Sequence, residues 1–301
     1  MHPSVAVARV APRQQLFALL CVLGIAALWV PCRSLLALCL EDERYTYIIL
    51  VPVISAAFLY LDRERILRDA GYCPAAGVPL MLLGLAVAFA SQFWLPGPAD
   101  LTLAAGTLVL LWIGAFISCY GMISVRRAGF PLVFLLLTVP IPRVVLDGMV
   151  AGLQSGSAEM SFLLFRVAHV PVFRRGMVMS LPGVDIEVAP QCSGIRSTMA
   201  LFIASVVVSR VLLRLSWTRA LVILSVAPIA IFRNSVRIVC ISLLGVYADR
   251  QFLFGRLHRY GGLPFSLVGF GILIPLVWLL GKCERRLGAD RVPQKSIPPP
   301  Q

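Results

Sequence analysis

The chain has 301 residues, of which 59% are hydrophobic and 14% are charged, and its formal net charge at pH 7 is +13. A soluble domain with this balance would expose far too much apolar surface, so the composition excludes a soluble globular protein and indicates a multispanning membrane protein. The arginines stand singly or in pairs beside apolar runs, without an aromatic-laced basic face, which argues against nucleic-acid binding.

Apolar runs recur along the chain, and they predict an all-α membrane protein with about eight transmembrane helices. The expected spans cover residues 16–30, 45–61, 78–94, 101–122, 130–141, 197–213, 220–232 and 263–280. We expect one membrane domain over residues 16–281, after a basic N-terminal segment at 1–15. The first span is expected to be retained, because it lacks a good signal-peptide cleavage pattern. Residues 282–301 form a basic, proline-rich tail that we expect to be disordered.

Two segments interrupt this pattern of spans, the first at residues 143–191 and the second at residues 232–237. Residues 143–167 combine charged side chains with apolar ones at helical spacing, which predicts an amphipathic helix lying at the membrane interface. Residues 178–188 alternate polar and apolar side chains around Pro182 and Gly183, which predicts a short hairpin or loop. The second interruption is the polar stretch at 232–237. The apolar run at 238–246 is too short to cross alone, so we expect a short interfacial or re-entrant helix there.

Loop charge predicts the orientation of the chain. With eight spans and both ends inside, the short outer loops at residues 41–44 and 95–100 contain one basic residue, Arg44. The two interrupting segments and the loop at 249–262 then face the outer side. Because the other outer arginines lie in these irregular segments, we expect several of them to be functional.

A cysteine stands where an irregular polar segment turns into a long apolar helix. Residues 188–197 are VAPQCSGIRS, with Ser193 and Gly194 as helix-start residues. Cys192 is therefore expected near the water boundary, at the positive end of a helix dipole, with Arg196 one turn further on. These conditions raise the thiolate fraction of a cysteine. No Cys-x-x-Cys pair and no zinc-like cysteine–histidine spacing occurs in the sequence, so we expect neither a metal site nor a cofactor.

Two further residues are expected on the same outer side as Cys192. A cysteine nucleophile requires a group that takes and returns a proton, and histidine is best suited near neutral pH. Of the three histidines, His258 lies at the mouth of the last span. The oxyanion of acyl transfer requires a positive or hydrogen-bonding partner, which the guanidinium of Arg237 would supply. The sequence therefore predicts one catalytic site formed by Cys192, Arg237 and His258.

Several motifs together resemble the exosortase/archaeosortase family. They are PQCSGIRS at 190–197, NSVRI at 234–238, His258 before a final span, YTY at 45–47 leading into LVP at 50–52, Arg63 after that span, and PIP at 140–142. The resemblance covers roughly residues 45–281, and the cysteine motif is its most specific part. The catalytic Cys, Arg and His of the family correspond to Cys192, Arg237 and His258.

Arg233 is the rival for the arginine role, but the Asn-x-x-Arg spacing that begins at Asn234 selects Arg237. Arg196, Arg233 and Asn234 are expected to contact substrate or to support the site. Gln191 and the Thr46-Tyr47 pair depart from residues common in the family, which leaves the substrate subclass open.

The resemblance implies a polytopic cysteine protease or transpeptidase of the bacterial inner membrane, with its active site facing outward. Its expected substrates are exported proteins that end in a Pro-Glu-Pro-type sorting motif, a span and a basic tail, cleaved through a thioester acyl-enzyme. The exact motif, the acyl acceptor and the oligomeric state stay open. The group that orients His258 also stays open, with Asp185, Glu187, Asn234 and Asp249 as candidates.

Three other protein classes fit part of the pattern. A transporter would place ionisable groups near the bilayer midplane, but the spans at 45–61, 78–94, 101–122 and 263–280 contain no charged residue. A thiol–quinone oxidoreductase would require a paired cysteine, which the sequence does not suggest. A non-catalytic scaffold that only binds sorted proteins stays an alternative.

Overall fold

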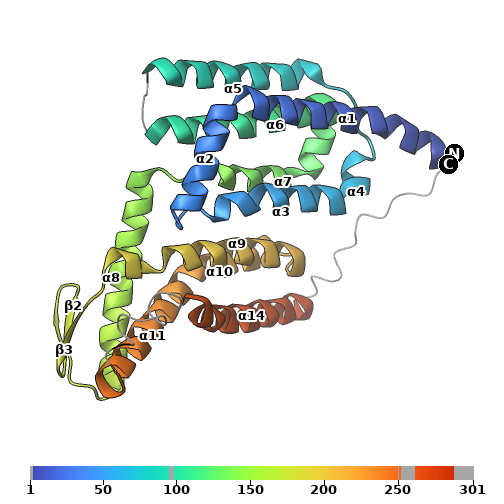
Figure 1. Cartoon of the computed structure of the whole chain (residues 1–301). Helices are drawn as coiled ribbons and strands as arrows, with labels where there is room; N and C mark the ends of the chain where they lie inside the picture. Colours follow the sequence, from blue (N-terminus) through green and yellow to red (C-terminus); the bar gives the residue numbers. More distant parts are fainter. Residues whose placement is uncertain (1–2, 95–97, 250, 252–261, 288–301) are drawn as a thin grey trace. The chain divides into compact units, whose positions relative to one another are not determined.

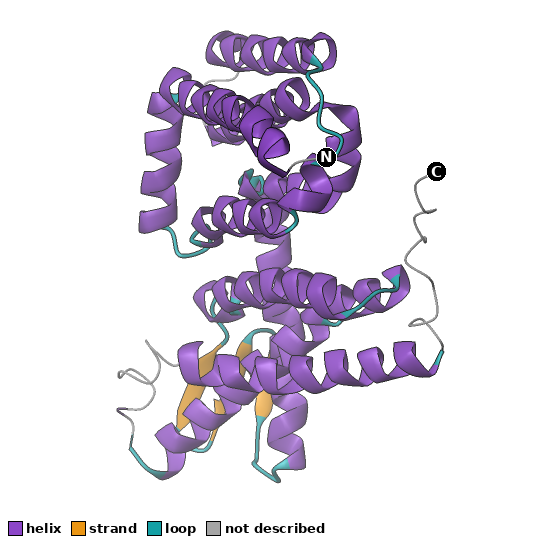
Figure 2. Ribbon diagram, turned by 90° about the vertical axis from the view of Figure 1, so that its right-hand side faces the viewer, coloured by secondary structure: helices purple, strands orange, loops and turns teal. Residues whose placement is uncertain are grey.

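The computed structural model describes residues 3–94, 98–249, 251 and 262–287 (Figure 1). The chain divides into two compact units, residues 1–143 and 144–301. The described residues are almost wholly helical, and their only strands form one small sheet in the second unit (Figure 2). Residues 288–301 of the predicted tail lie outside the described residues.

The first unit is a bundle arranged around α6. Its elements are α1 (Pro3–Ala27), α2 (Trp29–Glu41), α3 (Tyr47–Leu61), α4 (Arg63–Leu67), α5 (Pro74–Trp94), α6 (Pro98–Arg127), α7 (Gly129–Phe134) and the 3-10 helix η1 (Leu135–Thr138). α5 lies alongside α6 (Figure 1). A Cβ atom on Gly77 of α5 would lie 2.1 Å from the Oγ of Ser118 on α6. The missing side chain therefore allows the two backbones to approach closely, as in many membrane helix pairs.

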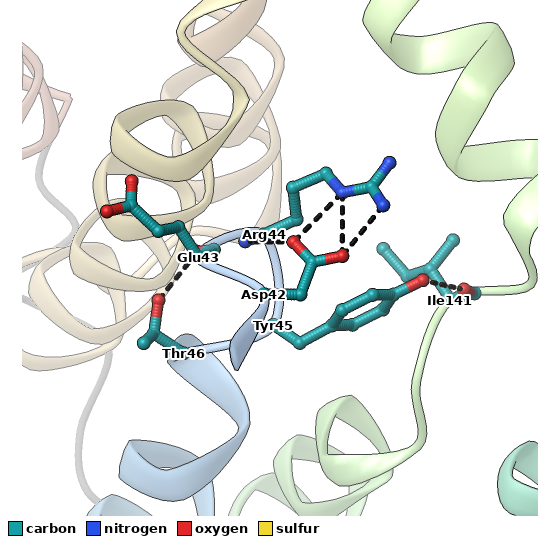
Figure 3. A network of polar contacts seen from close by, with 6 residues as sticks. All are labelled: Asp42, Glu43, Arg44, Tyr45, Thr46 and Ile141. Atoms are coloured by element: carbon teal, nitrogen blue, oxygen red, sulfur yellow. Dashed lines mark hydrogen bonds and ion pairs between the residues drawn. The ribbon is translucent and has the colours of Figure 1, made fainter. Parts of the chain in front are cut away.

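The loop between α2 and α3 is fixed by polar contacts within the first unit (Figure 3). The Arg44 Nη2 donates to Asp42 Oδ2 at 2.7 Å, and the Arg44 Nε lies 3.0 Å from both carboxylate oxygens. Hydrogen bonds from the Arg44 side chain lower the pKa of Asp42. The hydroxyl of Tyr45 donates to the carbonyl of Ile141 at 3.4 Å. The YTY and PIP motifs, which lie far apart in the sequence, therefore meet in this unit.

The second unit places a small sheet beside a group of helices. Its elements are α8 (Arg143–Val167), β1 (Phe173–Arg175), β2 (Val178–Leu181), β3 (Val184–Glu187), the 3-10 helix η2 (Pro190–Ser193), α9 (Ile195–Leu212), α10 (Ser216–Leu224), α11 (Val226–Tyr247) and α14 (Gly262–Arg286). The strands form an antiparallel sheet in the order β1-β2-β3. β2 and β3 confirm the predicted hairpin around Pro182 and Gly183, whereas the third strand, β1, was not predicted.

Two apolar clusters hold the second unit together. The first lies between α9, α10, α11 and α14 and includes Leu201, Val222 and Leu273. The second lies between α8, the sheet and α11 and includes Phe165 and Met179. α11 takes part in both clusters, with Val226 and Ile229 in the first and Val239 in the second, so packing holds both halves of the helix.

The fold class is confirmed as a multispan helical membrane protein. Five of the eight predicted spans fall on one described helix each, and those at 16–30, 130–141 and 220–232 cross a break between consecutive helical segments. Among the described helices, four stretches are long and apolar enough to cross a membrane, and they are Leu101–Arg127, Pro190–Leu212, Ser216–Tyr247 and Pro264–Arg286. If each of two bent helix pairs counts as one span, the number of candidate spans among the described helices rises to six. Two shorter apolar helices are Tyr47–Leu61 and Pro74–Ala90. The orientation stays a prediction.

α1 ends at Ala27, close to the predicted end of the first span, and α2 follows it after an 81° bend and buries Leu35 and Cys39. Two local predictions were wrong. The polar stretch at 232–237 does not break the chain, since α11 is one helix from Val226 to Tyr247. The C-terminal tail does not begin at residue 282, because α14 extends to Arg286, where its last turn carries basic side chains that suit a helix C-terminus.

α8 confirms the helix predicted at 143–167, but its buried face was not foreseen. The residues that it buries are Leu146, Leu153, Ser157, Ala158, Ser161 and Phe165. Several large apolar side chains of the helix point outward, and Val144 is 86% exposed. The small serines and alanine allow close packing inside the unit, and the outward apolar side chains suit a lipid surface. The interfacial position of α8 stays a prediction.

Candidate active site

Cys192 lies in η2, the single 3-10 turn that joins the sheet to α9. Pro190 begins the turn, and the Cys192 N–H donates to the carbonyl of Ala189 at 2.8 Å. Gly194 ends it with a φ of 70°, and α9 begins at Ile195. Cys192 is half-buried and forms no disulfide. The structure thus places the thiol just before a long apolar helix, as the sequence predicts.

Two neighbouring side chains of α11 hold the backbone of this turn. The Asn234 Nδ2 donates to the Cys192 carbonyl at 2.6 Å and to the Ser157 Oγ of α8 at 3.0 Å. The Arg233 Nη2 donates to the Gly194 carbonyl at 3.4 Å. Asn234 is 2% exposed and Arg233 is 3% exposed. These internal partners explain why α11 continues through its polar stretch: buried polar side chains that are hydrogen-bonded need not leave the helix.

Gly194 is required by two separate features of the site. Its φ of 70° is in the left-handed region, which glycine adopts at the lowest cost. In addition, a Cβ at this position would lie 3.0 Å from the Arg233 Nη2 and 3.1 Å from the Asn234 Oδ1. The SG pair in the cysteine motif therefore allows α11 to approach the backbone next to the thiol.

Cys192 opens into a pocket of about 250 Å³ in the second unit. One wall is formed by residues 184–189, which comprise β3 and the two residues after it. The opposite wall is one face of α11, with Asn234, Arg237 and Ile241 among its residues. The pocket lining therefore includes a cysteine, an arginine and the acidic residues Asp185 and Glu187 beside apolar residues.

The structure brings some of the predicted site residues together. Cys192, Arg237 and Asn234 line the same pocket. Arg233 is buried against the Gly194 backbone instead, which makes it a supporting residue rather than a pocket residue. Arg196 is exposed on the first turn of α9 and does not line this pocket. His258 lies outside the described residues.

Of the four candidates for orienting His258, three line the pocket. They are Asp185, Glu187 and Asn234, while the Asp249 Oδ1 accepts a hydrogen bond from the backbone of Gln251 at 2.9 Å. Two supporting residues on α8 were missed by the sequence analysis. One is Ser157, and the other is Gln154, whose Nε2 donates to the Val188 carbonyl at 2.5 Å. Their spacing of one helical turn within an amphipathic segment was the available signal.

The described residues of the pocket supply two of the parts that acyl transfer requires on the enzyme side. A thiol that opens into a pocket is accessible to a carbonyl group, and a guanidinium on the facing wall stabilises negative charge. The buried amide of Asn234 fixes the main chain at the thiol, so the fold itself holds the position of Cys192.

Comparison with known families supports the same class of protein. The family model for the transmembrane exosortase (EpsH) matches residues 39–275. No curated protein and no solved structure matched the chain. The matched residues include the α2–α3 loop, both interrupting segments and the whole pocket around Cys192. The chain therefore belongs to the transmembrane exosortase family.

Proposed function

We propose that this exosortase cleaves the C-terminal sorting signal of exported membrane-anchored proteins through a cysteine-linked acyl-enzyme. Membership of the family implies a membrane sorting protease. The observation that carries the proposal is a pocket lined by both Cys192 and Arg237, which separate elements contribute, with the Asn234 amide bonded to the Cys192 carbonyl.

In the proposed reaction the Cys192 thiolate attacks the scissile carbonyl carbon, and the carbonyl oxygen becomes an oxyanion. Arg237 stabilises that oxyanion. The tetrahedral intermediate collapses, the C–N bond breaks, and His258 protonates the departing amine. The product is a thioester on Cys192, which an acceptor amine or water then resolves, with His258 taking the proton of the attacking group.

The proposed substrate has a Pro-Glu-Pro-type motif, a span and a basic tail. The basic tail would hold the substrate span in one orientation in the inner membrane, and the motif would then lie at the outer surface near the pocket. Two partners held in one membrane plane meet in a restricted set of orientations, which lowers the entropy cost of bringing them together for reaction.

Co-expression with a reporter tests this proposal. The reporter is an exported protein that carries a Pro-Glu-Pro motif, a span and a basic tail, and cleavage is followed by its size on a gel. Cys192→Ala should abolish cleavage while the enzyme remains in the membrane. Cys240→Ala is the matched control, because Cys240 is exposed on α11 and does not line the pocket. Cleavage by the Cys192→Ala variant at the wild-type rate would rule the proposal out.

A further inference from the structure

β3 is an outer strand of the sheet, and the direction of its backbone groups is fixed by observed contacts. β3 pairs with β2 alone in the strand order. Leu181 faces Val184 across the hairpin turn, and the Val188 N–H donates to the Met177 carbonyl at 3.0 Å. Because backbone groups alternate in direction along an antiparallel strand, the even-numbered residues bond to β2. The N–H and C=O groups of Asp185 and Glu187 therefore point away from β2.

The pocket runs along this outer edge of β3. Five consecutive residues, 184–188, contact it. Successive side chains of a strand point to opposite faces of a sheet, so a space on one face would contact only alternate residues. A space that contacts all five lies beside the edge. The strand also runs toward Ala189 and then Cys192, and both of these residues line the same pocket.

The outer edge offers unpaired main-chain groups to whatever enters the pocket. In the described part of the chain, no residue outside the ladder hydrogen-bonds to the backbone of Asp185 or Glu187, and within the ladder these two residues point away from β2. The facing wall of α11 presents Arg237, Ile238 and Ile241, which lie on one face of that helix. An entering chain would thus meet main-chain partners on one side and a mostly apolar surface on the other.

We propose that the substrate segment before the scissile bond adds to the outer edge of β3 as an extended strand, which delivers its carbonyl carbon to Cys192. This inference rests on the function proposed above. Backbone groups of Asp185 and Glu187 pair with the substrate main chain, and side chains of the substrate reach the apolar wall. Strand addition satisfies the amide groups of a peptide beside apolar side chains, where each unpaired group would be costly.

The dimensions of the pocket favour one peptide strand over other occupants. Pockets that enclose a drug-sized ligand have volumes of roughly 300–1,000 Å³. The 250 Å³ between β3 and α11 holds a few residues of a single chain. Pairing with β3 of a second copy would bring another whole hairpin to the same edge, which is a larger occupant than this pocket volume.

Peptides that alkylate the thiol test the inference on the full-length protein in detergent. The probe is acetyl-Val-Ala-Val-Ala chloromethyl ketone: the Cys192 thiolate displaces chloride from the methylene carbon, and mass spectrometry gives the labelling rate. Four further probes carry a single N-methyl group, one on each residue in turn. Strand addition predicts an alternating result, with about a 3- to 10-fold slower reaction when a paired N–H is methylated and little change for its neighbours.

Backbone variants of β3 give a second readout. Glu187→Pro removes an outward N–H that does not bond to β2, and Glu187→Ala removes the carboxylate but keeps that N–H. The proline variant should label at least about threefold more slowly than the alanine variant. Ile186→Pro removes an N–H that does bond to β2, and it reports how a disrupted sheet behaves in a thermal-unfolding assay.

The outcomes separate this inference from the proposed function. Iodoacetamide, which is too small to require strand pairing, measures the reactivity of Cys192 itself. If Cys192 reacts with iodoacetamide but the N-methyl series is uniform, or if none of the peptides reacts, strand addition is wrong and the nucleophile stands. A Cys192 that reacts with neither reagent would overturn the proposed nucleophile and this inference together. Loss of an oligomer on Glu187→Pro, with a uniform N-methyl series, would assign the edge to a second copy.

Discussion

Replacing Gly194 by alanine should damage the active site far more than a simple loss of backbone freedom predicts. Gly194 separates Cys192 from the first turn of α9 and has a φ of 70°. The alanine methyl group would lie 3.0 Å from the Arg233 Nη2 and 3.1 Å from the Asn234 Oδ1. Both contacts are tighter than normal packing, so the Asn234 amide must move away from the cysteine turn.

Two terms contribute to the expected magnitude. A non-glycine residue in the left-handed region costs roughly 1–2 kcal/mol. Displacing Asn234 weakens its bond to the Cys192 carbonyl and leaves a buried amide poorly paired, which costs roughly another 1–3 kcal/mol. A shift of the nucleophile by about 1 Å would lower the rate on the order of 10²-fold. We therefore expect a loss of about 3 kcal/mol in stability and of at least about tenfold in processing.

Gly176 provides a matched control for the backbone term. It also has a positive φ, 62°, and a Cβ there would meet no atom within 4 Å. Gly176→Ala should thus show the conformational cost alone. Both variants are compared by thermal unfolding in detergent and by cleavage of the co-expressed reporter. Equal reporter cleavage by the Gly194→Ala and Gly176→Ala variants would refute the claim that Asn234 and Arg233 fix the cysteine turn.

Three further changes have defined outcomes. Asn234→Ala removes the hydrogen bonds to the Cys192 carbonyl and to Ser157. The free energy of unfolding should fall by about 1–3 kcal/mol, and reporter cleavage should fall as well. Cleavage at the wild-type rate would show that the amide is dispensable. The Glu284 carboxylate accepts hydrogen bonds from the backbone N–H groups of Arg214 and Leu215, just before α10 begins, and Glu284→Ala removes this acceptor. We expect its melting midpoint to lie well below that of Glu284→Gln. Equal midpoints would show that these hydrogen bonds do not stabilise the protein. The Asp42 pKa is lowered by the Arg44 side chain, so the stabilisation is complete above about pH 4 and is lost as the pH falls below that value. The free energy of unfolding of Asp42→Asn should therefore lie below that of wild type at pH 6 by at most about 1 kcal/mol, and this difference should shrink toward pH 3. A difference that grows in acid would contradict the lowered pKa of Asp42.

Most of the helices were predictable because the hydropathy of a segment follows from its own residues alone, without knowledge of the segments that pack against it. The apolar run at 101–122 needed no knowledge of its neighbours, and α6 covers it. α11 was different. Asn234 and Arg233 are polar in the sequence, and only their partners at Cys192 and Gly194 show why a helix tolerates them. Such partners come from distant segments, so no local pattern predicts them.

The candidate site shows the same division between local and distant information. Cys192 was found from its own surroundings, at the start of a long apolar helix. The pocket wall formed by β3 depends on strand pairing and on the packing of the sheet against α8 and α11. Pro182 and Gly183 predicted the hairpin itself, but the sequence does not show that the outer edge of β3 lines the same pocket as Cys192. Ser157 was hidden in a helix whose large apolar residues dominated the pattern.

Trapping of the acyl-enzyme tests the central claim most directly. The full-length protein is incubated in lipid vesicles with a peptide that contains a Pro-Glu-Pro motif and a span, quenched in acid and digested for mass spectrometry. We predict a hydroxylamine-sensitive thioester on the peptide fragment that contains Cys192, with the N-terminal part of the substrate attached. Cleavage of the substrate with no adduct at Cys192, or with an adduct on another residue, would contradict the assignment of Cys192 as the nucleophile.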